Sequence, residues 1–170
     1  MKIIRIILWW IFVLSIPILL VSTVVRLEVQ FQPFYEYEYE KNNINQVTGF
    51  DNRQLGIITR HLIQYFNGKV ASPQIVVQKN DEPMYLFGDH ELVHLEDVKD
   101  IFQSVFIIQY ISLGYFFFYL LINIVFKRKN KLIDFWRGLK NGSNLTVVLL
   151  LILGIGMFTG FHNLFIQFHY

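Results

Sequence analysis

Three long apolar runs dominate the pattern of hydrophobic and polar positions along the chain. They extend from Ile6 to Val25, from Ile101 to Phe126 and from Leu145 to about Leu164. About 20 apolar residues in a helix, at about 1.5 Å per residue, match the roughly 30 Å hydrocarbon core of a bilayer. The pattern therefore predicts an α-helical integral membrane protein with three transmembrane helices. The second run exceeds the required length, so we expect that helix to tilt or protrude.

The charged residues between these runs predict how the helices cross the membrane. Lys2 and Arg5 precede the first run, and a single acid, Asp134, lies among six basic residues between the second and third runs. By the positive-inside rule both basic segments are expected in the cytoplasm. The two assignments agree, because a chain that crosses the membrane twice returns to the side on which it started. Residues 26–100 carry 12 of the 13 acidic residues against seven basic ones and are therefore expected outside. The basic residues of the second segment are Lys127, Arg128, Lys129, Lys131, Arg137 and Lys140.

The runs divide the chain into five expected parts. Residues 1–26 form an N-terminal transmembrane helix, and residues 27–100 form an extracellular α+β loop domain. Residues 101–126 form the second transmembrane helix, 127–144 a basic cytoplasmic loop, and 145–170 the third transmembrane helix and its outer end. Because the chain ends where that last helix leaves the membrane, we expect either a truncation or a further span beyond it.

The outer loop contains patterns for a strand, a helix and a hairpin. Tyrosine and glutamate alternate over residues 35–40, which favours an extended strand with one aromatic face resting on lipid. Residues 51–66 have apolar positions at helical spacing after Asp51, a good N-cap, and predict an amphipathic helix on the membrane surface. The runs "PQIVVQ" and "PMYLFG" predict a hairpin with a four- or five-residue loop. Asp89 is then expected to cap a helix that continues into the second span.

Composition narrows the functional classes. Hydrophobic residues make up 54% of the chain and aromatic residues 17%, which is outside the usual range of soluble domains. The chain has no cysteine, so it can form no disulfide, thiolate metal site or cysteine acyl-enzyme. It has no glycine-rich phosphate loop, and its basic segment is explained by topology, so no nucleic-acid partner is expected. The expected environment is the phospholipid bilayer, and nothing in the pattern indicates an oligomeric state.

Histidines provide the main chemical signal. The five histidines, at positions 61, 90, 94, 162 and 169, are all expected at or beyond the outer membrane surface. Histidine titrates near pH 6.5 and is the commonest general base. "HELVH" at 90–94 also matches the H-E-x-x-H zinc peptidase pattern, although it opens a helix and needs a distant third ligand such as His162, His169 or Asp97. A zinc metallopeptidase and a non-enzymatic membrane subunit or sensor are therefore alternatives.

Two longer strings point to a particular family. "HLEDVKDIF" at 94–102 and "GFHNLFIQFH" at 160–169 resemble the bacterial lipoprotein intramolecular transacylases. The tyrosine-glutamate segment, "YFNGK" at 65–69 and the topology extend this resemblance over nearly the whole chain. The family continues into a fourth span, which this chain lacks. Position 162 is histidine where an acidic or other polar residue is expected, so no role is carried over to it.

The resemblance implies a membrane acyltransferase at the outer face of the bacterial cell membrane. The substrate would be a diacylglyceryl lipoprotein, whose sn-2 acyl chain moves to the α-amino group of its N-terminal cysteine to give the N-acyl lyso form. That amine has a pKa near 7.7 to 8.0, so a base must deprotonate it. We expect direct transfer without a cofactor or metal.

The resemblance and the chemistry together give a set of expected site residues. We expect His94 to be the principal base and His169 to orient the substrate or stabilise the oxyanion. Asp97, one helical turn after His94, either fixes the imidazole tautomer or merely solvates the helix. The supporting candidates, as oxyanion donors or secondary site residues, are Lys99, Arg53, Arg60 and His162.

Overall fold

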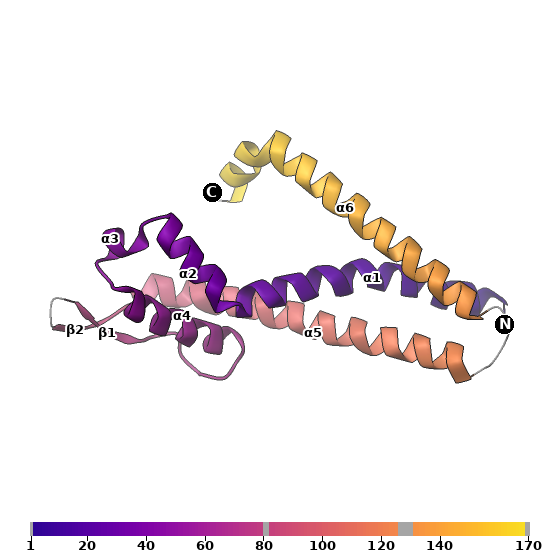
Figure 1. Ribbon diagram of the computed structural model, residues 1–170, viewed down its shortest axis with the longest axis horizontal. Coiled ribbons are helices and arrows are strands. Elements are labelled where there is room, and N and C mark those ends of the chain that lie inside the picture. Colours follow the sequence, from indigo (N-terminus) through magenta and orange to yellow (C-terminus); the bar gives the residue numbers. More distant parts are fainter. Residues whose placement is uncertain (1, 80–81, 126–130, 169–170) are drawn as a thin grey trace. The chain divides into compact units, whose positions relative to one another are not determined.

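The computed structural model describes residues 2–79, 82–125 and 131–168, with side chains except at 131–132 and 158–168 (Figure 1). The described chain is 82% helical and has one small two-stranded sheet. It divides into two compact units, which we call unit 1 (Met1–Val21 with Gln109–Tyr170) and unit 2 (Ser22–Ile108). The elements in order are α1 (Lys2–Gln30), α2 (Gln32–Lys41), α3 (Ile44–Thr48), α4 (Asn52–Phe66), β1 (Val76–Lys79), β2 (Glu82–Tyr85), α5 (Asp89–Val125) and α6 (Lys131–Phe168).

Three helices are long and apolar enough to cross a membrane, which confirms the prediction of three long apolar helices. Among the described residues they are Lys2–Gln30, Asp89–Val125 and Ile133–Met157. The third begins earlier than predicted. Residues 131–144 had been assigned to a loop, but α6 is helical from Lys131 onward, so the loop prediction is wrong for them. Residues 126–130 lie outside the described part of the chain.

Unit 1 is held together by close helix contacts between α1 and α6. A Cβ on Gly142 would lie 2.6 Å from the Ile16 Cβ and 2.9 Å from the Val13 carbonyl oxygen. A Cβ on Gly138 would lie 2.8 Å from the Phe12 ring. The two glycines form a G-x-x-x-G pattern, which lets two helix backbones approach closely in a membrane.

Aromatic rings fill the space beside these glycines. Phe12 is fully buried and stacks on Tyr119 of α5, with ring centroids 4.3 Å apart and an interplanar angle of 18°. The ring centroids of Phe135 of α6 and Phe12 are 5.3 Å apart. The Tyr115 hydroxyl donates to the Leu8 carbonyl oxygen at 2.8 Å, which ties α5 to α1. Rings and glycines thus join the three helices of unit 1.

In unit 2, α4 forms as predicted but in a different environment. The Asp51 carboxylate accepts a hydrogen bond from the Gln54 backbone N–H (2.7 Å), and the Gln54 side chain accepts one from the Asp51 N–H (3.2 Å). This is a capping box, which fixes the start of the helix. The apolar face of α4 is covered by protein, so the prediction that it lies on the membrane surface is wrong. Its buried residues are Leu55, Ile58, Thr59, Tyr65 and Phe66.

The predicted strand over residues 35–40 is also wrong, because these residues form α2. Pro33 lies in the first turn, where its missing N–H costs nothing. Two of the tyrosines then face inward: the Tyr35 hydroxyl donates to the Val29 carbonyl oxygen (3.2 Å), and the Tyr39 hydroxyl bonds the Thr59 hydroxyl (2.7 Å). Tyr37 is 58% exposed. The spacing of four between the inward tyrosines is helical.

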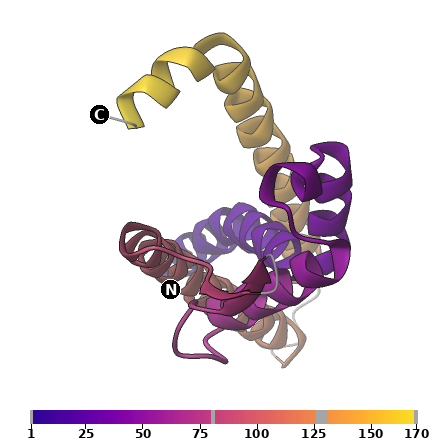
Figure 2. The ribbon, with the colours of Figure 1, turned by 90° about the vertical axis from the view of Figure 1, so that its left-hand side faces the viewer.

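The hairpin is confirmed, with a shorter connection than predicted. β1 and β2 are antiparallel, and Lys79 is paired with Glu82, so only two positions separate the paired ends. In Figure 2 the hairpin is seen beside α4. Val77 of β1 belongs to a buried cluster with Phe50 and Leu55, while β2 is exposed throughout.

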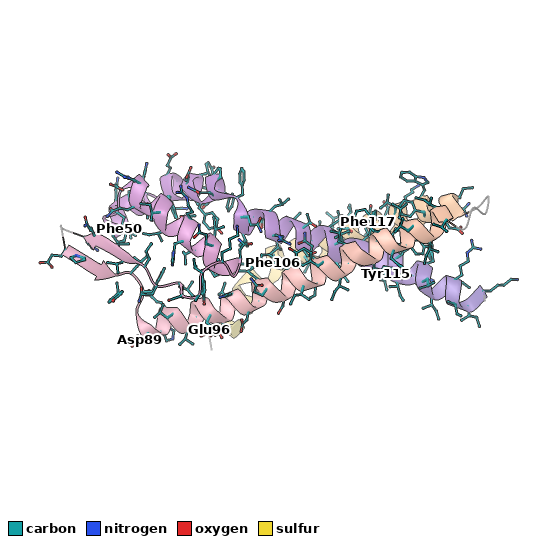
Figure 3. The ribbon with its side chains drawn as sticks, turned by 90° about the horizontal axis from the view of Figure 1, so that it is seen from below. Phe50, Asp89, Glu96, Phe106, Tyr115 and Phe117 are labelled. Carbon is teal, nitrogen blue, oxygen red and sulfur yellow. The ribbon has the colours of Figure 1, made fainter. Side chains whose placement is uncertain are left out.

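Helix α5 begins at Asp89, but the residue that caps it is Gly88. The Leu92 N–H donates to the Gly88 carbonyl oxygen (3.0 Å), and the Glu91 carboxylate accepts from the Gly88 N–H (2.8 Å). Glu91 therefore performs the reciprocal half of a capping box, and Asp89 is the first helical residue. Figure 3 shows Asp89, Glu96 and Phe106 in order along this helix.

Candidate functional site

The first turns of α5 present His94 to the outside of unit 2. Leu95, Val98 and Phe102 pack against the buried cluster around Phe66, which anchors one face of the helix. His94 lies beside that face and is exposed. An exposed imidazole on an anchored helix is open to a substrate and held in position by the packing of its neighbours.

Asp97 lies one turn after His94 and is also exposed. Three residues along a helix bring two side chains to neighbouring positions on its surface. Within the described residues there is no hydrogen bond between the two. The helix thus provides the adjacency that was expected from sequence, with both side chains free to rearrange around a bound molecule.

Lys99 belongs to another side of α5. Five residues at about 100° each place it about 140° around the helix from His94. Its ammonium group lies 4.2 Å from the centroid of the Tyr65 ring on α4. Burial raises the pKa of the Tyr65 phenol above its ordinary value of 10.0, and the charges of Glu96 and Asp100 add to this. The phenol is therefore neutral at neutral pH, and the cation rests on an uncharged ring.

Arg53 and Arg60 line a groove between α2 and α4, which we call the α2/α4 groove. It has a volume of about 400 Å³, and Glu36 of α2 faces the two arginines across it. Both arginines are exposed, and neither forms an ion pair with a described residue. The structure thus groups these two candidates with each other and with an acid of α2. The other lining residues are Gln32, Asn52, Gly56 and Ile57.

The remaining histidines have different environments. The His61 ring nitrogen Nε2 lies 3.1 Å from the Ser72 carbonyl oxygen and ties α4 to the following loop. His90 is exposed at the start of α5. His162 belongs to α6, whose backbone is described there, but its side chain is not among those described. His169 lies outside the described residues. The structure therefore does not test the pairing of His94 with His169.

Among the described side chains, no group of three histidine, aspartate or glutamate residues is arranged to hold a metal ion. Glu91, the acid of the H-E-x-x-H pattern, is bonded to the Gly88 N–H at the helix start.

Sequence reasoning did not single out Arg26, which lies at the end of the first apolar run. In unit 2 its guanidinium carbon lies 4.8 Å from the centroid of the Phe106 ring of α5, and the side chain is half-buried. Gln103 of α5 donates to the Phe66 carbonyl oxygen at 2.6 Å, and Gln30 of α1 donates to Asn67 at 2.9 Å. These polar contacts join the end of α1 and the end of α4 to α5, where His94 stands. The sequence feature that could have pointed to Arg26 is its position directly after an apolar run.

Comparison with protein families identifies the family of this chain. A family model described as lipoprotein intramolecular transacylase Lit matches residues 10–170. The chain belongs to the Lit family. The match includes α5 with His94, α6 and α1 from residue 10 onward. Searches of curated proteins and of solved structures gave no match. Membership of the Lit family indicates a membrane transacylase that acts on lipoproteins.

Proposed function

We propose that this protein transfers the sn-2 acyl chain of a diacylglyceryl lipoprotein to the α-amino group of the same lipoprotein's N-terminal cysteine. The observation that carries the proposal is the Lit family match over residues 10–170. The amine nitrogen attacks the ester carbonyl, a C–N bond forms, and the bond between the carbonyl carbon and the sn-2 oxygen breaks. The proton lost by the amine is returned to the sn-2 oxygen, which leaves as a hydroxyl of the lyso form.

In this mechanism His94 is the general base. An α-amine with a pKa near 8 is mostly protonated at neutral pH and first has to lose one proton to solvent; as the free amine then attacks, a nearby imidazole can accept its second proton and return it to the leaving oxygen. The exposure of His94 supports this role, because a base has to reach a proton on a bound lipid. Since amine and ester belong to one molecule, orientation supplies much of the acceleration, with effective molarities of about 10⁵ M or more.

The other candidates have supporting roles. His169 is proposed as the partner of His94, and His162 as a secondary residue deeper along α6. Asp97 is proposed to orient the His94 ring once substrate excludes water. Lys99, held on Tyr65 at another side of α5, is proposed to add positive potential around this part of the helix. Arg53 and Arg60 in the α2/α4 groove are proposed as further cationic groups facing the substrate's polar part.

The proposed location of this chemistry is the outer face of the bacterial cell membrane. Arg5 of α1 forms an ion pair with Asp134 of α6, so the two basic segments meet at the same end of unit 1. This supports a topology in which both segments are cytoplasmic. Residues 27–100, with His94, then lie on the opposite side of the bilayer.

The decisive experiment is mass spectrometry of lipoprotein N-termini from cells with and without this protein. The N-acyl lyso form is expected only when the protein is expressed. Its absence at normal expression would refute the enzyme assignment.

A matched pair of variants tests the proposed base. His94→Gln is expected to reduce formation of the lyso form by about 10²- to 10⁴-fold, the usual contribution of a general base. His90→Gln, one turn earlier on the same exposed helix surface, is the control and should retain activity. Full activity in His94→Gln would remove His94 from the mechanism. Loss of activity in His90→Gln together with stoichiometric zinc in the purified protein would favour the peptidase alternative.

A further inference from the structure

Unit 1 contains a cavity at the N-terminal end of α1, which we call the end cavity. It has a volume of about 480 Å³. Helices α1 and α6 both begin at this end of unit 1 (Figure 1). The proposed acyl transfer does not use any of its residues. They are Lys2, Arg5, Ile6, Trp9, Trp10 and Asp134.

The wall of the end cavity is fixed by two contacts to Asp134. The Arg5 guanidinium bonds the Asp134 carboxylate, and the Trp9 indole N–H donates to the Asp134 carbonyl oxygen at 3.0 Å. The close approach at Gly138 and Gly142 brings α6 near enough for both contacts. The cavity is therefore built by residues from both helices.

The charge of the end cavity is positive. The one acid in the lining, Asp134, is already paired with Arg5. Lys2 is exposed and forms no ion pair with any described residue, so its ammonium is left as net positive charge. Arg5 has five N–H donors, and several can still reach a second acceptor. The cavity is thus suited to one phosphate group.

Its apolar lining indicates the kind of phosphate compound. Trp9, Trp10 and Ile6 provide apolar surface directly beside the two cations. Tryptophan is favoured at the headgroup level of a bilayer, where one part of the ring is dry and another is wet. The third tryptophan, Trp136, also lies near the start of α6. Cations beside apolar aromatic surface match a lipid, whose phosphate and acyl chains are adjacent. Basic pockets between transmembrane helices are known to take anionic head groups.

We propose that the end cavity binds the phosphate head group of an anionic phospholipid. Lys2 and Arg5 contact the phosphate, and Trp10 contacts the glycerol and upper acyl region. A zwitterionic lipid binds less well, because its ammonium group is repelled by Lys2. The bound lipid bridges α1 and α6 at the end where Arg5 and Asp134 already join them.

Native mass spectrometry of the full chain can test this binding. Protein is titrated with phosphatidylglycerol, with phosphatidylcholine or with inorganic phosphate, and the retained lipid is counted. Phosphatidylglycerol is expected to be retained in preference to phosphatidylcholine. Equal retention of the two lipids, or displacement of phosphatidylglycerol by inorganic phosphate, would overturn the proposal.

Two matched pairs of variants locate the site. Lys2→Gln is expected to weaken phosphatidylglycerol binding about fivefold, as expected for one basic residue at a membrane surface. Lys140→Gln removes the same charge from an exposed position of α6 outside the cavity and should have little effect. Likewise Trp10→Leu should weaken binding and Trp136→Leu should not. An equal effect within either pair would show a general surface attraction and overturn the proposal.

Discussion

The two units of this protein are stabilised in opposite ways. In unit 1 many large apolar side chains are exposed, among them Leu151 at 61% and Leu153 at 60%, and the contacts between helices depend on glycines and stacked rings. Unit 2 has two buried apolar clusters, α4 begins with a capping box, and the Glu91 carboxylate bonds the Gly88 N–H at the start of α5. Unit 1 therefore depends mainly on close contacts between helices, and unit 2 depends more on buried apolar clusters and on hydrogen bonds at the ends of its helices.

This difference changes which interaction contributes stability. In lipid, moving an apolar side chain into a helix interface gains little from leaving the solvent, so close packing has to supply the stability. In water, burial itself is favourable, and buried polar groups must be bonded. In unit 2 the buried Thr59 hydroxyl meets this requirement through the Leu55 carbonyl oxygen and the Tyr39 hydroxyl.

The largest expected effect comes from truncating a buried phenylalanine in each unit. Phe66→Ala should lower the free energy of unfolding by about 3–5 kcal/mol, because it loses both transfer and packing energy. Phe12→Ala should cost less, since in lipid mainly the packing is lost. Denaturant unfolding in mixed micelles measures both. An equal or larger loss of unfolding free energy in Phe12→Ala would contradict the conclusion that the two units are stabilised in different ways.

The second-largest loss of stability is expected from a substitution at the glycine contact of unit 1. Gly142→Ala places a methyl group against Ile16 and the Val13 backbone, and should cost about 1–3 kcal/mol. Gly114→Ala is the matched control, because a Cβ there meets nothing within 4 Å. The control should be neutral or stabilising by up to about 1 kcal/mol. Thermal unfolding of both variants measures the two changes, and a similar loss of stability at Gly114 would contradict the conclusion that the contact with Ile16 and Val13 causes the loss at Gly142.

A smaller effect is expected from the helix caps of unit 2. Asp51→Ala removes the capping box of α4 and should cost about 1 kcal/mol. Asp89→Ala should cost only a few tenths of a kcal/mol from the helix dipole, because Gly88 occupies the cap of α5. Hydrogen exchange at the first turns of α4 and α5 measures each change locally. Stronger fraying at α5 than at α4 would show that Asp89 caps its helix.

The smallest expected effect is at the contact between Lys99 and Tyr65. Lys99→Met should cost about 0.5–1 kcal/mol, and Tyr65→Phe should preserve the interaction because the ring remains. The pKa of Tyr65 is raised, so the stability that comes from its neutral form is complete below pH 10 and is lost as pH rises through the raised value. Unfolding measured between pH 7 and 9 should therefore show a constant difference between Lys99→Met and the parent. A difference that grows with pH within this range would contradict a neutral ring, because an ionised phenol would attract the Lys99 ammonium more strongly.

The three spans, α4 and the hairpin could be predicted because each has a strong pattern of its own. Helix α2 could not, because tyrosines alternating with glutamates match a strand when read without their partners. The Val29 carbonyl and the Thr59 hydroxyl select Tyr35 and Tyr39, four residues apart, and leave Tyr37 outside. Hydrogen bonds to distant residues are therefore consistent with a helix here, although the alternation of tyrosine and glutamate is typical of a strand.

The start of α6 was missed for a related reason. Its basic residues have the composition of a cytoplasmic loop, and composition carries no information about contact. The pair Gly138 and Gly142 was the available signal, since small residues four apart mark a close helix interface. At the candidate site, the sequence correctly predicted a helix carrying His94 and Asp97. It did not predict that Lys99 would face Tyr65, because that depends on where α4 lies.

The unbroken start of α5 has a consequence for how lipid reaches His94. The apolar run begins at Ile101, seven residues later in the same helix, which is about 10 Å along the helix axis from His94. The polar zone on each side of a bilayer is only about 5–8 Å thick. If the hydrocarbon core begins at Ile101 and His94 is the base as proposed, an ester at its resting depth falls short of the imidazole, so the glyceryl group has to be lifted or the bilayer has to thicken around the protein. Hydrophobic thickness would thereby set the rate of transfer, and membranes of graded chain length would show it.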